Sequence, residues 1–328
     1  MISTVSKSPP PSGVLSLGEL LQQQPMPQPC LIEPGLLPPQ GILFLGGEPK
    51  VGKSLFVANL ALCLAAGSSR GGFRVSAPHR VLMCQFELPV DQFAARLTGM
   101  RHAIGSAADA NLFVDTRSSG HLLSSTTGLN HFLSAARCAA AEVIVLDPLY
   151  SAHDQDENDT RAMAALCQSL LRLRDSSKAA LIVVHHVRKS IGRYEIGSAF
   201  RGSSALHAVG DSYVLLTRPS PQLNTVELRF QFRYAASQQP RLLELDPNSL
   251  WFSAAGQGPA PLATRHKVES SDVTRALAGI GAQARYNELR SKIMSLTDCS
   301  KRTAQLAITQ AGRDGLIVQD DGHYRLSL

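Results

Sequence analysis

Long uncharged apolar runs are missing from this sequence of 328 residues. A membrane-spanning helix needs about 18 to 20 consecutive apolar residues, and because no such run occurs we expect neither a transmembrane helix nor a membrane partner. The first 40 residues also lack a basic start followed by an apolar stretch, which argues against a secretory signal. Together these absences predict a cytoplasmic protein.

Paired metal-binding cysteines are missing as well. The six cysteines form no CxxC or CxxH pair, and several lie inside apolar runs such as ALCLAAG and VLMCQF. This placement is typical of small buried thiols in a reducing compartment and argues against a zinc site or disulfides. The formal net charge of +6 is compatible with a polyanionic partner such as nucleic acid.

The chain has four predicted parts. Residues 1–30, rich in proline, glutamine and serine, read as a flexible leader. Residues 31–253 alternate apolar strands with helices, which predicts an α/β core with a mainly parallel sheet and helices on both faces. Within it, Asp91 is the expected N-cap of the helix that follows VLMCQFEL. Residues 254–264 have the composition of a linker.

Residues 265–328 predict a small winged helix-turn-helix domain. Three short helices are followed by a hairpin that turns at Asp321-Gly322, and the last helix begins after Ser300 as its N-cap. Lys301 and Arg302 lie on the exposed stripe of that helix and are candidate DNA contacts. With ten basic and seven acidic residues the segment is only mildly basic. Its charge therefore leaves two partners open, duplex DNA or a protein.

The segment GGEPKVGKS matches the phosphate-binding pattern G-x-x-x-x-G-K-[ST] at every fixed position. An apolar strand ends just before it and a helix begins within it, as the motif requires. Lys53 is expected to reach the β- and γ-phosphates of ATP, and the Ser54 hydroxyl to contact Mg²⁺. The predicted nucleotide-binding residues are Gly47, Glu48, Pro49, Lys50, Val51, Gly52, Lys53, Ser54 and Leu55.

Two acidic residues close neighbouring apolar strands. Asp147 ends VIVLD and is the predicted Mg²⁺-side carboxylate. Because Pro148 follows it, no glutamate stands beside Asp147 to activate water. Glu87, at the end of VLMCQFE, is therefore the predicted catalytic acid–base residue.

A histidine pair and a basic segment follow in IVVHHVRKS and FRGSS. His185 or His186 is expected to sense the γ-phosphate at the carboxyl edge of the sheet, with His186 favoured. The segment after them is either a solvated loop or a nucleic-acid contact. In the second case Arg201 reaches a phosphate, and DNA is contacted by Arg188, Lys189 and Arg193.

In their order, GGEPKVGKS, FELP, VLDPL…DENDT, VHHVRKS and FRGSSAL resemble the motifs of the RecA-like hexameric ATPases, and among these the plasmid replicative helicases of the RepA type. The resemblance covers about residues 30 to 250. It implies a hexameric ring with ATP at each subunit interface and single-stranded DNA through the centre. It also implies that Arg201 is an arginine finger supplied across the interface. The chain differs from that family in having Leu88-Pro89 after the acid.

The leading hypothesis is an ATP-hydrolysing ring-forming motor on single-stranded DNA that serves replication of a plasmid or other mobile element. One alternative is a DNA-binding regulator or adaptor in which the ATPase core is a slow switch. Another is a recombination or repair ATPase of the same fold without helicase activity. Strand separation, sequence-specific duplex binding and strand exchange distinguish the three.

Overall fold

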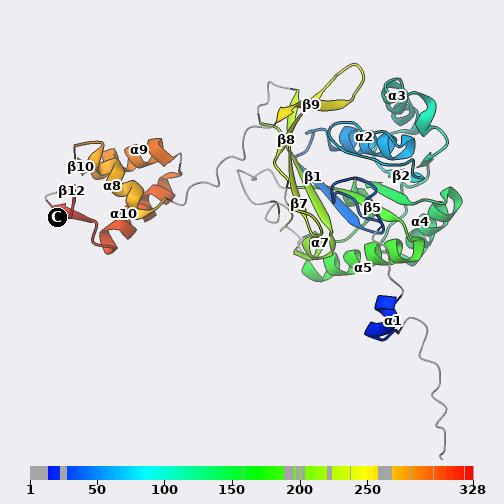
Figure 1. Cartoon of the computed structure of the whole chain (residues 1–328), viewed down its shortest axis with the longest axis horizontal. Helices are drawn as coiled ribbons and strands as arrows, with labels where there is room; N and C mark the ends of the chain where they lie inside the picture. The colour runs from blue at the N-terminus through cyan, green and yellow to red at the C-terminus, as the bar shows by residue number, and fades with distance from the viewer. Residues whose placement is uncertain are drawn as a thin grey trace, which may run out of the picture. The chain divides into compact units, whose positions relative to one another are not determined.

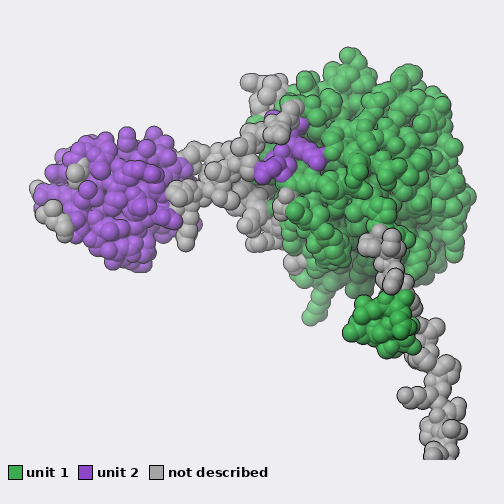
Figure 2. Space-filling model, viewed as in Figure 1, with its two compact units in different colours: residues 1–238, 243–255 green, residues 239–242, 256–328 purple. Residues whose placement is uncertain are grey.

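The chain forms two compact units, residues 1–238 with 243–255 and residues 239–242 with 256–328 (Figure 2). The computed structural model describes residues 14–22, 28–157, 159–187, 196, 200, 204–219, 224–236, 238–257, 268–281, 283–297, 299–320 and 322–327. The six-residue helix α1, Leu17–Gln22, belongs to the first of these segments and has no buried side chain.

The larger unit is built on a nine-stranded sheet (Figure 1). Its strands are β1 Ile42–Gly47, β2 Val81–Gln85, β3 Leu112–Asp115, β4 Val143–Asp147, β5 Ala180–His186, β6 Ser212–Thr217, β7 Thr225–Phe232, β8 Arg241–Leu245 and β9 Phe252–Gln257. Their order across the sheet is β3-β2-β4-β5-β1-β6-β7-β8-β9. The first six strands in this order run parallel to their neighbours, and β7 is antiparallel to β6. The predicted mainly parallel α/β core is confirmed.

Helices cover both faces of the sheet (Figure 1). One face carries α2 and α3 and the other carries α4, α5 and α7, with bounds α2 Lys53–Ala66, α3 Val90–Arg101, α4 Thr126–Ala139, α5 Thr160–Ser177 and α7 Ser204–Val209. Two short 3₁₀ turns, η1 Gly105–Ala108 and η2 Leu149–Ala152, complete this part of the unit. None of the helices in the described segments has both the length and the apolar character needed to cross a bilayer.

Alternation along β1 shows why this layering forms. Leu43 and Leu45 pack into the core beneath α2, while Ile42 and Phe44 pack into the opposite core with α5. All of β1 is buried, because a strand in the middle of a parallel sheet has helices above and below it. The sequence therefore buries apolar residues on both faces, and only the strand's carboxyl end remains for polar chemistry.

The smaller unit has its own core. Its elements are α8 Ser270–Ala278, β10 Gln283–Arg285, α9 Tyr286–Thr297, α10 Lys301–Arg313, β11 Ile317–Asp320 and β12 His323–Leu326. The strands form an antiparallel sheet in the order β10-β12-β11. The three predicted helices and the hairpin are present, and Ser300 caps α10 by accepting a hydrogen bond from the N–H of Thr303 at 3.2 Å. β10 is an additional strand that the sequence pattern did not predict.

Three local predictions need correction. Helix α3 begins at Val90 with Pro89 at its N-cap, so Asp91 lies in the first turn and is not the cap. The sequence pattern predicted no strand at Leu112–Asp115, where backbone pairing with β2 forms β3. β9 extends to Gln257, so residues 254–257 belong to a strand and not to the predicted linker, because backbone pairing does not require apolar side chains.

Candidate nucleotide-binding site

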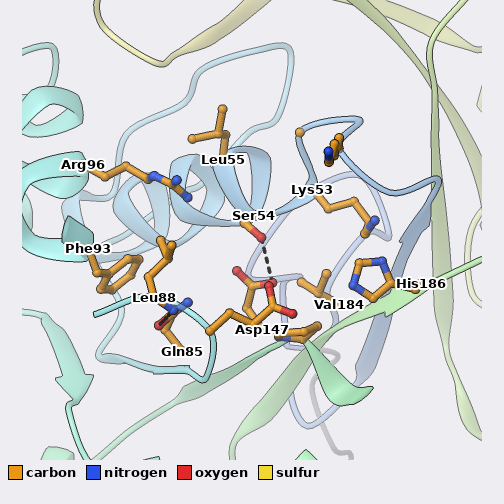
Figure 3. A pocket seen from close by; sticks show the side chains of 14 residues that line it. Lys53, Ser54, Leu55, Gln85, Leu88, Phe93, Arg96, Asp147, Val184 and His186 are labelled. Carbon is orange, nitrogen blue, oxygen red and sulfur yellow. Dashed lines mark hydrogen bonds between the residues drawn. The ribbon is translucent and has the colours of Figure 1, made fainter. Parts of the chain in front are cut away.

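A pocket of about 340 Å³ lies where the carboxyl ends of β2, β4 and β5 meet the start of α2 (Figure 3). Polar side chains from all four elements line it, among them Lys53, Ser54, Asp147 and His186. In parallel α/β sheets the carboxyl ends of adjacent strands share one edge, and ligands bind there. The fold thus brings together residues that lie more than a hundred positions apart in the sequence.

The loop between β1 and α2 requires its two glycines. A Cβ added to Gly47 would lie 2.7 Å from the carbonyl oxygen of Leu216, which is too close for a side-chain carbon, so only glycine fits at this position. Gly52 has φ +106°, outside the range that side chains readily allow. The turn is completed by Glu48, Pro49 and Val51. The pocket is lined in addition by Lys50 from this turn and by Leu55 from α2.

The N-terminus of α2 opens without a side-chain cap. Gly52 occupies the N-cap position and, having no side chain, makes no capping hydrogen bond to the first turn. The leading N–H groups of a helix lack partners within the helix and favour an anion. This end of α2 is therefore suited to phosphate oxygens.

Lys53 is buried at the start of α2 and its ammonium group donates to the carbonyl oxygens of Gly47 and Glu48, each at 2.9 Å. Burial lowers the pKa of Lys53 to about 8, although the nearby carboxylates of Asp147 and Glu87 oppose the shift. Because burial outweighs these carboxylates, and the hydrogen bonds of Lys53 in the described structure go to carbonyl groups, its charge is incompletely compensated. A phosphate chain in the pocket would supply the missing negative charge.

Asp147 is 2% exposed and accepts a hydrogen bond from the Ser54 hydroxyl at 3.1 Å, as Figure 3 shows. Burial raises the pKa of Asp147 to about 6, and the bond from Ser54 opposes that rise. A carboxylate and a hydroxyl side by side offer the hard oxygen donors that Mg²⁺ prefers. Ser54 and Asp147 therefore suit a divalent cation.

Asp147→Asn should stabilise the ligand-free protein at pH 7.5. A folded-state pKa raised from 3.8 to about 6, with the attraction of Lys53 already included, disfavours folding above pH 6 by on the order of 3 kcal/mol. Because the amide also changes the hydrogen bond with Ser54, we expect a net gain of about 1–2 kcal/mol in the free energy of unfolding at pH 7.5, and none below about pH 3, where the carboxyl is protonated in both states. Urea unfolding at the two pH values measures it. A loss of stability at pH 7.5 would contradict this electrostatic account.

Glu87 lines the pocket just beyond β2 and its side chain is exposed. Its carboxylate is close enough to influence the pKa values of Lys53, Asp147 and His186. The backbone around it is fixed: the N–H of Phe86 donates to the carbonyl oxygen of Asp147 at 3.1 Å. Glu87 is thus held at the pocket with its carboxylate free to meet a ligand.

The structure separates the two histidines at the end of β5. His186 lines the pocket on the side of Lys53 (Figure 3). His185 points away and is buried, with Nδ1 4.0 Å from a carboxylate oxygen of Glu157. Burial, aided by the Lys53 cation, lowers the pKa of His186, and Nδ1 of His186 has no hydrogen-bond partner among the described residues. A neutral imidazole at this place suits a phosphate oxygen or a water molecule.

The basic residues predicted to contact DNA or phosphate divide into two groups. Arg188, Lys189, Arg193 and Arg201 lie outside the described residues. Lys301 and Arg302 are exposed in the first turn of α10 in the smaller unit. The lining of the pocket, as far as the structure describes it, contains neither group.

Arg96 is a pocket residue that sequence reasoning missed. It projects from α3 toward Ser54 and Leu55 (Figure 3), and its charge acts on Asp147. No sequence signal marks it, because α3 carries a second arginine, Arg101, and only the packing of the helix decides which one reaches the pocket. Arg101 instead binds Asp109, with Nε donating at 2.6 Å.

Comparisons with known proteins agree with this geometry. A family described as an AAA domain matches residues 7–191, more than half of the chain. No curated protein matches the chain.

Two solved structures share the fold. One, described as an ATPase domain, has a TM-score of 0.51 and 14% identity, over 66% of this chain and 85% of that one. The other, a DnaB-like replicative helicase described with its interactions with primase, has a TM-score of 0.52 and 15% identity, over 66% of this chain and 57% of its own length. At such low identity the likeness shows the fold alone, and it confirms the predicted RecA-like core.

Proposed function

The chain belongs to the AAA domain family, and from that premise we propose that it is an ATP-hydrolysing, ring-forming motor on single-stranded DNA, a replicative helicase of a plasmid or other mobile element. The observation that carries the proposal is the pocket in which Lys53, Ser54, Asp147, Glu87 and His186 meet. A phosphate-binding lysine, a cation-binding pair and a separate exposed carboxylate are the parts that phosphoryl transfer to water requires.

In this proposal each residue has one role. Lys53 and the open N-terminus of α2 would bind the phosphates of ATP, and Ser54 with Asp147 would hold Mg²⁺, whose charge would offset that of the phosphate oxygens. Glu87 orients a water molecule and accepts its proton as general base. His186 contacts the γ-phosphate side of the site.

The ring and the DNA are the second part of the proposal. The DnaB-like helicase supports it through its shared fold, and the net charge of +6 suits a polyanion. We assign single-stranded DNA contact to Arg188, Lys189 and Arg193. Arg201 is the proposed arginine finger that enters the site of the next subunit in a hexamer.

For the smaller unit we propose a winged helix-turn-helix that binds duplex DNA. Its elements follow the order α8, β10, α9, α10, β11 and β12, with α10 as the recognition helix. Lys301 and Arg302 are exposed at the start of that helix, where phosphate contacts are usual. Replacing both should weaken duplex binding and flatten its dependence on salt.

Unwinding of a forked DNA duplex with ATP and Mg²⁺ tests the proposed function, together with electron microscopy of the assembled protein. We expect strand separation and closed rings from the parent protein, and from Lys53→Ala no strand separation and hydrolysis slower by about a hundredfold or more. ATP hydrolysis without strand separation would favour the DNA-binding regulator. Absence of hydrolysis under all conditions would contradict the proposal.

Arg96→Ala should lower kcat for ATP hydrolysis by about tenfold to a hundredfold, since a charge-assisted contact to a phosphate contributes roughly 1.5–3 kcal/mol. Steady-state kinetics measure the loss. Arg101→Ala on the same helix is the matched control and should retain the parental rate, because Arg101 is paired with Asp109 outside the pocket. Equal losses in both variants would assign the effect to α3 stability and not to Arg96.

A further inference from the structure

A serine from a neighbouring connection contacts the segment that carries Glu87. The hydroxyl of Ser119 donates to the carbonyl oxygen of Phe86 at 3.1 Å. Phe86 directly precedes Glu87, and its N–H is already bonded to the end of β4. Both backbone groups of Phe86 are therefore fixed, one by a central strand and the other by Ser119. Ser119 itself follows β3, the strand beside β2.

The connection that holds Ser119 is a tight turn anchored on Asp115, the last residue of β3. The carboxylate of Asp115 accepts a hydrogen bond from the N–H of Arg117 at 3.0 Å, and its carbonyl accepts one from the Ser118 hydroxyl at 3.1 Å. Ser118 is fully buried, and its carbonyl oxygen accepts from the N–H of His121 at 3.2 Å. These bonds leave the backbone at Ser119 little freedom to move.

Helix α4 fixes the same turn from the other side. Nε2 of His131 lies 2.6 Å from the second carboxylate oxygen of Asp115, and its ring stacks on His121 with centroids 3.7 Å apart. The next residue on α4, Phe132, packs edge-to-face against Phe86 with centroids 6.1 Å apart. The turn and the Phe86 segment are thus supported by one helix as a unit.

We propose that Ser119 is a positioning residue for Glu87, an inference that rests on the proposed ATPase function. Glu87 is exposed and its side chain has no hydrogen bond of its own in the described structure, so the backbone before it sets the position from which its carboxylate reaches into the pocket. A general base must lie within about 2.6–3.2 Å of the proton it accepts, and small displacements are costly in rate. The bond from Ser119 holds the Phe86 carbonyl, and hence the start of the Glu87 segment, against the edge of the sheet.

Ser119→Ala tests the role, with Ser119→Thr and Ser124→Ala as companions. Removing the hydroxyl should lower kcat for ATP hydrolysis by about fivefold and leave KM unchanged, because Ser119 does not line the pocket. Ser119→Thr retains a hydroxyl and should recover most of the rate. Ser124 lies in the same connection but its hydroxyl donates to Asp154, so Ser124→Ala should behave as the parent.

A double substitution separates positioning from general stability. If Ser119 acts through Glu87, adding Ser119→Ala to Glu87→Gln should cause no further loss in the single-turnover rate. A further fivefold loss in that background, or a parental kcat for Ser119→Ala alone, would overturn the positioning role and leave the ATPase function standing. Absence of hydrolysis by the parent protein would contradict both.

Discussion

Lys53→Ala is expected to lower the rate of ATP hydrolysis by about a hundredfold to a thousandfold, the loss typical of removing one preorganised group that stabilises developing charge. The ammonium group of Lys53 is buried at the start of α2, held by two carbonyl oxygens of the phosphate loop. No other described lysine lies deep in the pocket, since Lys50 is exposed at its rim. No other described lysine can therefore substitute for the charge that Lys53 supplies.

The same substitution should leave the fold intact. Burial lowers the pKa of Lys53 to about 8, so holding its cation in the ligand-free protein disfavours folding. We expect the thermal midpoint of Lys53→Ala to be no lower than that of the parent. Lys178→Asn is the matched control: it removes an exposed lysine at the end of α5, where φ is +61° and asparagine is tolerated. Parental hydrolysis by Lys53→Ala would contradict the assigned phosphate site.

Glu87→Gln should lower kcat by about a hundredfold to ten-thousandfold, the range that general acid–base catalysis contributes. The amide preserves the size of the side chain but cannot accept a proton from water. ATP should still bind, because Lys53, Ser54 and Asp147 are unchanged. Single-turnover hydrolysis and equilibrium binding of a fluorescent ATP analogue measure the two effects separately.

Asp91→Asn provides the control for Glu87. Asp91 is an exposed carboxylate in the first turn of α3, four residues along the chain from Glu87 and outside the pocket lining. Its replacement should leave kcat within about twofold of the parent, since it alters only the charge near a helix start. If Glu87→Gln hydrolysed ATP at the parental rate, the general base would have to be another residue.

Local sequence patterns predicted those site residues that are consecutive in the chain or that stand at the end of a strand. The phosphate loop lies within a few consecutive residues, so its residue types alone indicate its conformation. Asp147 and Glu87 could be placed because the carboxyl ends of adjacent parallel strands share one edge of the sheet. For the histidine pair the sequence predicts alternation, but the register of β5 against β1, with His186 opposite Gly47, decides which ring faces the pocket.

Tertiary packing determined what the sequence could not show. Arg96 reaches the pocket only because α3 lies over it, and its sequence spacing does not distinguish it from Arg101. In the sequence Ser119 cannot be distinguished from other serines in polar turns. Its contact with Phe86 arises because β3 pairs with β2 and places the turn beside Phe86. β3 itself has only four residues, each half-buried, so its apolar pattern is too short to identify a strand without its partner β2.

The most direct measurement is the rate of ATP hydrolysis by the parent protein with Mg²⁺, in the presence and absence of a single-stranded oligonucleotide. The account predicts hydrolysis that rises several-fold with single-stranded DNA and is lost in Lys53→Ala. A rate that is unaffected by single-stranded DNA, or that Lys53→Ala retains, would contradict a DNA motor driven from this pocket.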